Sequence, residues 1–167
     1  GPEKFPIDAG RWGYIQPELE IFLKQNNTDS QISKKNTNIK LNVPCLLRHG
    51  IENNKKQSFL ACIADLLYYG KDESNNNIES VRNKLIDSIT IDDFIIYQNG
   101  NLVSDFKDYY RYLSNDELEK YKNSKLFQKI KTDEEMFYFK TVVSSYENFL
   151  RYINDKESII DYTYLWD

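Results

Sequence analysis

The sequence predicts a mainly α domain, α+β at most, with few short strands. Apolar residues recur at helical spacing in residues 58–69 and 133–154, whereas the clearest alternation with period two covers only residues 39–43. A chain of 167 residues is one domain on its length and can bury about two-thirds of its unfolded surface. We therefore expect a single domain, residues 1–167, organised around the 58–69 helix.

The 58–69 stretch is apolar on nearly every side. Its only charged residue is Asp65. Ser58 is of a residue type that caps helix N-termini, and Gly70 suits the left-handed position after a last turn. We expect a central helix that is buried all round.

The first part of the chain is predicted to be mostly irregular. Residues 1–16 combine proline, glycine and aromatic residues, which indicates an ordered N-terminal loop. A short helix is expected over residues 17–25, because proline suits the first helical position. Residues 26–38 are polar and aperiodic, which predicts a surface loop. Residues 39–43 are expected to form an edge strand or an extended segment that ends at Pro44.

Several helix starts are predicted in the second part of the chain. Residues 78–89 carry apolar residues on one face. Thr90 and Ser114 are each followed by acidic residues in the pattern of a helix N-terminus. Residues 94–97 fit a short helix best and a strand second.

The longest predicted helix covers residues 133–154. Apolar residues step by three and four along it, a spacing that forms a seam for packing against another helix; they are Met136, Phe139, Val143, Tyr146, Leu150 and Ile153. We expect this seam to lie against the 58–69 helix. The tail, residues 159–167, is too aromatic for a solvated end, so we expect it to pack on this domain or to continue into a further part. Gly1-Pro2 resembles a protease scar, which indicates a fragment of a longer protein.

Composition narrows the classes of partner. The formal charge of −4 argues against a domain that binds mainly through phosphate contacts. Cys45 and Cys62 lie in apolar runs without Cys-x-x-Cys spacing, which favours a reduced, intracellular chain. We expect neither a membrane span nor a signal peptide, since no apolar run approaches ~18 residues.

The residues also argue against a metal or cofactor site. Zinc takes about four nitrogen or sulfur ligands, and the chain offers only Cys45, Cys62 and His49. Glycine-rich phosphate cradles are missing from the sequence. Adjacent carboxylates lie where helices are expected to start, so compensation of the helix dipole accounts for them.

Residues 57–67 (Gln-Ser-Phe-Leu-Ala-Cys-Ile-Ala-Asp-Leu-Leu) resemble the nucleophile helix of OTU-type cysteine proteases. The resemblance implies a cysteine-protease-like fold, with Ser58 at the position of the nucleophilic cysteine. A serine hydroxyl needs a base, and no histidine follows Ser58 in the chain, so the nucleophile position is expected to be degenerate. Cys62, one turn into the helix, is expected to be a core residue.

A second resemblance extends over more of the chain. It rests on residues 10–15 with Pro17, residues 44–51, the central helix and residues 161–167. Together these motifs resemble the N-terminal half of the early transcription factor large subunit of nucleocytoplasmic large DNA viruses. Lysine, asparagine and isoleucine each number 17, a composition typical of an AT-rich genome such as a giant virus has.

The two resemblances together imply a non-catalytic, OTU-like interaction domain of a viral early transcription initiation factor. The expected partners are the other transcription factor subunit or RNA polymerase, with promoter DNA contacted by other parts of the protein. Such a factor works in the host cytoplasm, in viral factories or in the virion. The candidate contact residues are Trp12, Arg48, His49, Tyr164 and Trp166; for His49, beside Arg48, a structural role is the first reading.

Two alternatives stay open on the sequence. The first is an OTU-like deubiquitinase whose nucleophile is replaced by Ser58 and whose substrate is ubiquitin. The second is a helical domain of unrelated function.

Overall fold

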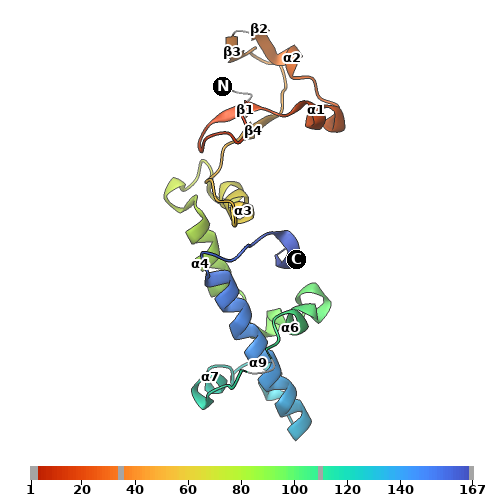
Figure 1. The fold of residues 1–167 in the computed structure, drawn as a ribbon, viewed down its shortest axis with the longest axis vertical. Coiled ribbons are helices and arrows are strands. Elements are labelled where there is room, and N and C mark those ends of the chain that lie inside the picture. Colours follow the sequence, from red (N-terminus) through yellow and green to blue (C-terminus); the bar gives the residue numbers. More distant parts are fainter. Residues whose placement is uncertain (1–3, 34–35, 109–110, 166–167) are drawn as a thin grey trace. The chain divides into compact units, whose positions relative to one another are not determined.

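The structure is a computed structural model that describes residues 4–33, 36–108 and 111–165 (Figure 1). About 53% of it is helical and the strands are few and short, which confirms the mainly α class. The chain divides into two compact units, Gly1–Asn53 and Asn54–Asp167, and each is described by itself. Within the described ranges no helix has the length and apolar character needed to cross a lipid bilayer.

The N-terminal unit, red to orange in Figure 1, contains two small antiparallel sheets. In the first sheet Trp12 lies opposite His49 and Gly13 lies opposite Arg48. The second sheet joins two consecutive strands with a register irregularity. The elements of this unit are β1 (Trp12–Tyr14), α1 (Pro17–Leu23), α2 (Asn27–Ser30), β2 (Gln31–Ser33), β3 (Asn36–Ile39) and β4 (Leu47–His49).

Several predictions for the N-terminal unit are wrong. Residues 1–16 include β1, and residues 26–38 hold α2, β2 and most of β3 rather than one surface loop. The expected strand at 39–43 ends at Ile39, because Asn42 takes a left-handed conformation (φ 61°) in the turn that follows. The short strands have little pattern of their own, and cross-strand pairing defines them.

The helix at Pro17 is confirmed, although it ends at Leu23 rather than near residue 25. Lys24 stops it by taking a left-handed conformation (φ 53°), and its N–H donates to the carbonyls of Glu20 and Ile21. No side chain of this helix is buried, so its apolar residues face outward.

The C-terminal unit is helical. Its elements are α3 (Ser58–Tyr68), η1 (Glu73–Asn75), α4 (Ile78–Ser88), α5 (Ile91–Phe94), η2 (Tyr97–Gly100), α6 (Asn101–Asp105), α7 (Asn115–Glu119), α8 (Lys125–Gln128), α9 (Asp133–Asn154) and η3 (Tyr162–Tyr164). Thr90, Ser114 and Thr132 each form a capping box at a helix start, so the predicted helix starts at Thr90 and Ser114 are confirmed. Of the two readings for residues 94–97, the strand is excluded.

The central helix forms as predicted but is not buried all round. Gly70 takes the expected left-handed conformation (φ 68°). Gln57, not Ser58, is the N-cap residue. The buried side of α3 consists of Leu60, Ala61 and Ala64, while Leu66 is 78% exposed and Cys62 lies at the surface rather than in the core. One side of α3 therefore packs and the other faces outward.

The helix α9 carries the core of this unit. Its inward residues Phe139, Val143, Tyr146 and Phe149 are buried in one apolar cluster. The helix packs on α4, α5, α6 and α7, with α6 and α7 on opposite sides of it in Figure 1, and α3 packs on α4. The predicted packing of the α9 seam along the central helix is therefore wrong, because α4 takes the place beside both helices.

The aromatic tail packs on its own unit, one of the two outcomes expected for it. Ile160 is buried, and Tyr164 and Leu165 pack against the apolar cluster. The Ile160 N–H donates to the Lys56 carbonyl over 2.9 Å, which joins the tail to the start of α3. Trp166 lies outside the described residues.

Candidate functional site

The start of α3 is held by a buried polar cluster. Gln57 is fully buried, and its Nε2 donates to the carbonyls of Asp155 (2.8 Å) and Ser158 (3.0 Å). Its Oε1 accepts from the guanidinium of Arg82, which is itself buried. Gln57 and Arg82 therefore tie α3, α4 and the segment after α9 together. The sequence does not reveal this role, because the partners lie far apart in the chain.

Ser58 is placed at the surface, next to this cluster. Among the described residues its hydroxyl has no hydrogen-bond partner, and it is an exposed residue at the first position of α3. His49, the one histidine in the sequence, belongs to the N-terminal unit. The described residues of the C-terminal unit therefore include no histidine that could act as a base on Ser58, and a hydroxyl without a base is a weak nucleophile.

Cys62 does not supply a thiolate in place of Ser58. Partial burial of its sulfur raises the pKa of the Cys62 thiol above its ordinary value, and the Asp65 carboxylate adds to the rise. A raised pKa keeps the thiol protonated near neutral pH, and only the thiolate attacks as a nucleophile.

Three predicted contact residues come together on the β1–β4 sheet. The rings of Trp12 and His49 stack across the two strands, with centroids 4.5 Å apart. Arg48 donates through Nε to the Tyr14 carbonyl over 2.6 Å, and its guanidinium also reaches the Lys4 carbonyl and the Phe5 ring. The sheet thus gathers the N-terminal segment around Arg48.

A cavity of about 310 Å³ opens beside this sheet. Its lining comes from β1, the start of α1, α2, β2 and β4: Tyr14, Ile15, Gln16, Pro17, Glu20, Asn27, Gln31 and Arg48. Two of these residues are buried, Tyr14 at 9% exposure and Asn27 at 4%. Among the described residues, the Tyr14 hydroxyl and the Asn27 Oδ1 have no hydrogen-bond partner.

Buried polar atoms in folded proteins are nearly always hydrogen-bonded, so unpaired buried atoms in two residues that line one cavity require an explanation. Of these lining residues, the sequence named only Arg48, as a candidate contact residue, and it did not indicate Tyr14, Glu20 or Asn27. Tyr14 lies within a motif that the sequence analysis named. No sequence pattern distinguishes Asn27 or Glu20, since a polar residue in a loop or short helix is expected at the surface.

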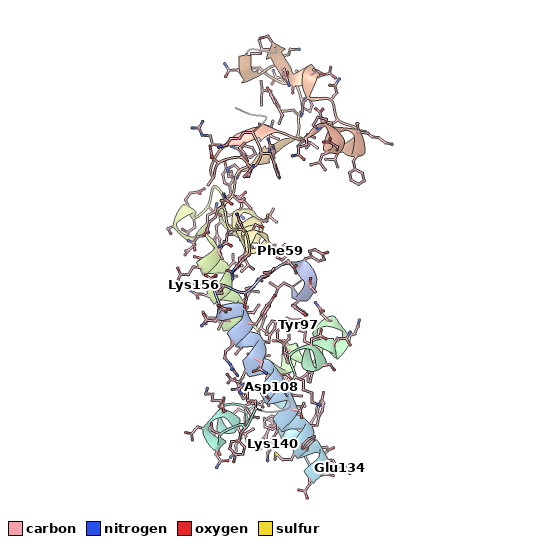
Figure 2. All side chains as sticks on the ribbon, viewed as in Figure 1. Phe59, Tyr97, Asp108, Glu134, Lys140 and Lys156 are labelled. Atoms are coloured by element: carbon pink, nitrogen blue, oxygen red, sulfur yellow. The ribbon has the colours of Figure 1, made fainter. Side chains whose placement is uncertain are left out.

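A second cavity, of about 340 Å³, lies beside α9 in the C-terminal unit. Asp108 and Lys140, labelled in Figure 2, are among its lining residues. Its Arg111 is already engaged: the guanidinium pairs with Glu117 and donates to Asn148 Oδ1 over 3.2 Å. This arginine holds α7 to α9, which makes a structural role the better reading.

Tyr164 is half-buried and packs on aromatic residues of the C-terminal unit. Its ring lies 5.0 Å from Phe106 and 5.7 Å from Tyr152, centroid to centroid. Its packing is therefore accounted for by the C-terminal unit. In the part of the chain that the structure describes, no group of three or more His, Cys, Asp or Glu residues is arranged to hold a metal ion.

Comparisons with protein-family models, with curated proteins and with solved structures give no match. Function is therefore inferred from the residues themselves.

Proposed function

We propose that this chain is a non-catalytic, OTU-like interaction domain of a viral early transcription initiation factor. Its partner would be the other transcription factor subunit or RNA polymerase, and promoter DNA would be bound by other parts of the protein. The motifs around Trp12, Arg48 and the central helix support this assignment by resemblance.

The state of Ser58 carries the non-catalytic part of the proposal. An OTU-type protease needs an activated nucleophile at the start of this helix, and Ser58 has no hydrogen-bond partner among the described residues. The pKa of the nearby Cys62 thiol is raised, which favours the protonated thiol over the nucleophilic thiolate. Both observations favour binding over hydrolysis.

An apolar surface on α1 supports the interaction part. Ile21 is 80% exposed and Phe22 is 79% exposed, and Leu19 and Leu23 beside them are also exposed. Large apolar residues that gather on one short helix are typical of a protein-binding surface. We assign this surface, Leu19–Leu23, to the partner subunit.

The first experiment tests for protease activity. The protein and its Ser58→Cys variant are incubated with a thiol-reactive ubiquitin probe and with a fluorogenic ubiquitin substrate. We expect neither labelling nor turnover, because a thiolate without an orienting histidine lacks the acid for the leaving group. Turnover by Ser58→Cys that is lost again in Ser58→Cys/His49→Ala would favour the deubiquitinase instead.

The second experiment tests for the partner. Binding of the chain to the purified second subunit of the factor and to the viral RNA polymerase is measured by surface plasmon resonance. Phe22→Asp should weaken binding at least about tenfold, the effect of losing one buried aromatic anchor. Leu41→Asp is the matched control, since Leu41 is 91% exposed in the same unit but lies outside α1. Equal binding by both variants would remove α1 from the interface.

A further inference from the structure

The outward side of α3 carries an apolar seam. Phe59, Cys62, Leu66 and the C-cap residue Tyr69 step by three, four and three, so they follow one side of the helix. Leu66 is 78% exposed, Tyr69 is 44% exposed and Cys62 is also exposed, while Phe59, labelled in Figure 2, is half-buried. A seam with this spacing is the form in which one helix packs along another.

This seam is separate from the side of α3 that the fold uses. Leu60, Ala61 and Ala64 are buried, and the helix packs on α4. Successive helical residues are about 100° apart, so Cys62 and Leu66 point roughly opposite to Ala64. The seam is therefore a second apolar face of the helix and not the rim of the core.

The charges at the two ends of α3 have an unusual order. Positive residues, Lys55 and Lys56, lie just before the helix, and a net negative charge, Lys71 against Asp72 and Glu73, lies just after it. The first turn has no acidic residue and the last turn no basic one. These charges have the same signs as the helix dipole, so they add to it instead of offsetting it. A second helix that runs antiparallel would bring opposite signs together at both ends.

The seam and the end charges agree on one register. If Cys62 of one copy lies opposite Leu66 of a second copy, then Phe59 lies opposite Tyr69. The same register brings Lys55 to the end where Glu73 of the second copy lies. That carboxylate is held close to the end of α3, because its Oε1 accepts from the Gly70 N–H over 2.7 Å. All three pairs are centred on the same point of the chain, so one twofold axis relates them.

We propose that α3 pairs, antiparallel and seam to seam, with α3 of a second copy of this chain. A second copy is favoured over an unrelated helix because the charges around α3 complement themselves once one copy is reversed. An eleven-residue helix is about 16 Å long, so the pair buries less surface than the ~1,600 Å² of a standard interface. We therefore expect a weak dimer, with a Kd of about 10–100 µM. The inference is independent of the transcription factor assignment.

Analytical ultracentrifugation of the intact chain tests the dimer. The mass should rise from monomer toward dimer between about 1 µM and about 500 µM protein. Leu66→Asp places a charge in the seam and should weaken dimerisation at least about tenfold. Phe137→Asp is the matched control and should leave the dimer unchanged, since Phe137 is 71% exposed in the same unit but lies on α9. Far-UV circular dichroism checks that both variants keep the fold.

Charge reversal tests the antiparallel register. Lys55→Glu places like charges together at both ends of the pair and should weaken dimerisation about fivefold, because the contact occurs twice. Adding Glu73→Lys restores opposite charges at both ends and should bring the Kd back to within about threefold of wild type. In a parallel pair each charge faces its own copy, so neither change would have this pattern.

Three results would overturn the proposal. A monomer at every concentration would show that a second copy does not cover the seam. Equal dimerisation of Leu66→Asp and wild type would place the interface elsewhere. An unchanged Kd in Lys55→Glu, or no recovery in Lys55→Glu/Glu73→Lys, would exclude the antiparallel register. Lys55→Glu keeps the test valid if Leu66→Asp does not fold, because Lys55 is exposed and lies before the helix.

Discussion

The two units of this chain are built on opposite principles. The C-terminal unit buries a continuous apolar cluster on α9 that includes Phe94, Phe139 and Phe149. In the N-terminal unit, Tyr14 is the one buried apolar or aromatic side chain among the residues whose burial is described, beside buried Asn27 and Ser30. Apolar burial contributes about 25 cal/mol per Å², so the C-terminal unit has by far the larger hydrophobic stabilisation.

The N-terminal unit depends instead on backbone bonds between distant residues. Gly10 N–H donates to the Gly50 carbonyl over 2.8 Å, and Gly50 N–H donates to the Arg11 carbonyl over 2.7 Å. Net contributions of single hydrogen bonds are small, about 1 kcal/mol each. We expect a unit held in this way to open more readily than the C-terminal unit.

The largest effect is expected in the apolar core. Val143→Asp places an unpaired charge at a fully buried position of α9 and should destabilise the C-terminal unit by more than about 4 kcal/mol. Phe137→Asp is the control on the same helix, since Phe137 is 71% exposed, and should change stability by about 0.5 kcal/mol or less. Chemical denaturation followed by circular dichroism measures both. Similar midpoints would mean that the α9 face is assigned wrongly.

The buried polar cluster at the start of α3 should have the next largest effect. Gln57→Leu leaves the Arg82 guanidinium and two carbonyls without their partner and should cost about 2–3 kcal/mol. Ser58→Ala changes the neighbouring exposed residue and should have little effect. If denaturation gave the two variants the same stability, the hydrogen bonds of Gln57 to the segment after α9 would not contribute to the free energy of unfolding.

Gly50→Ala should destabilise the N-terminal unit and leave the C-terminal unit unchanged. A Cβ at Gly50 would lie 1.9 Å from the Asp8 carbonyl oxygen, so the β1–β4 region must shift. Overpacking of this kind costs about 1–3 kcal/mol. Hydrogen exchange should show lost protection for the amides of Gly10 and Gly50, while the amides of α9 stay protected. Equal loss of protection in α9 would show that both units unfold as one cooperative domain, as the chain length predicts.

The smallest effect is a pH dependence confined to the C-terminal unit. Burial raises the pKa of Tyr152 to about 12, with a further contribution from the Asp161 carboxylate. The unfolded chain loses this proton near pH 10, so stability present below pH 10 declines as the pH rises through about 12. Tyr152→Phe should reduce that decline, measured as the denaturation midpoint between pH 9 and about 12. If the loss of stability with rising pH were unchanged in Tyr152→Phe, other tyrosines would be its cause.

Local patterns in the sequence determined most of the C-terminal unit. The bounds of α9 follow from its step of three and four and from the capping box at Thr132, and α4 begins and ends within one residue of its prediction. A helix closes its hydrogen bonds between residues four apart, so its signal lies in neighbouring residues.

Only the tertiary structure decided the rest. The partner of the α9 seam, the burial of Gln57 against Arg82, the β1–β4 pairing and the cavity with Tyr14 and Asn27 all join residues far apart in the chain. Side chains such as Asn27 and Gln57 look like solvated polar residues in the sequence. Whether they are buried, and which atoms they leave unpaired, depends on which distant segments the chain brings against them.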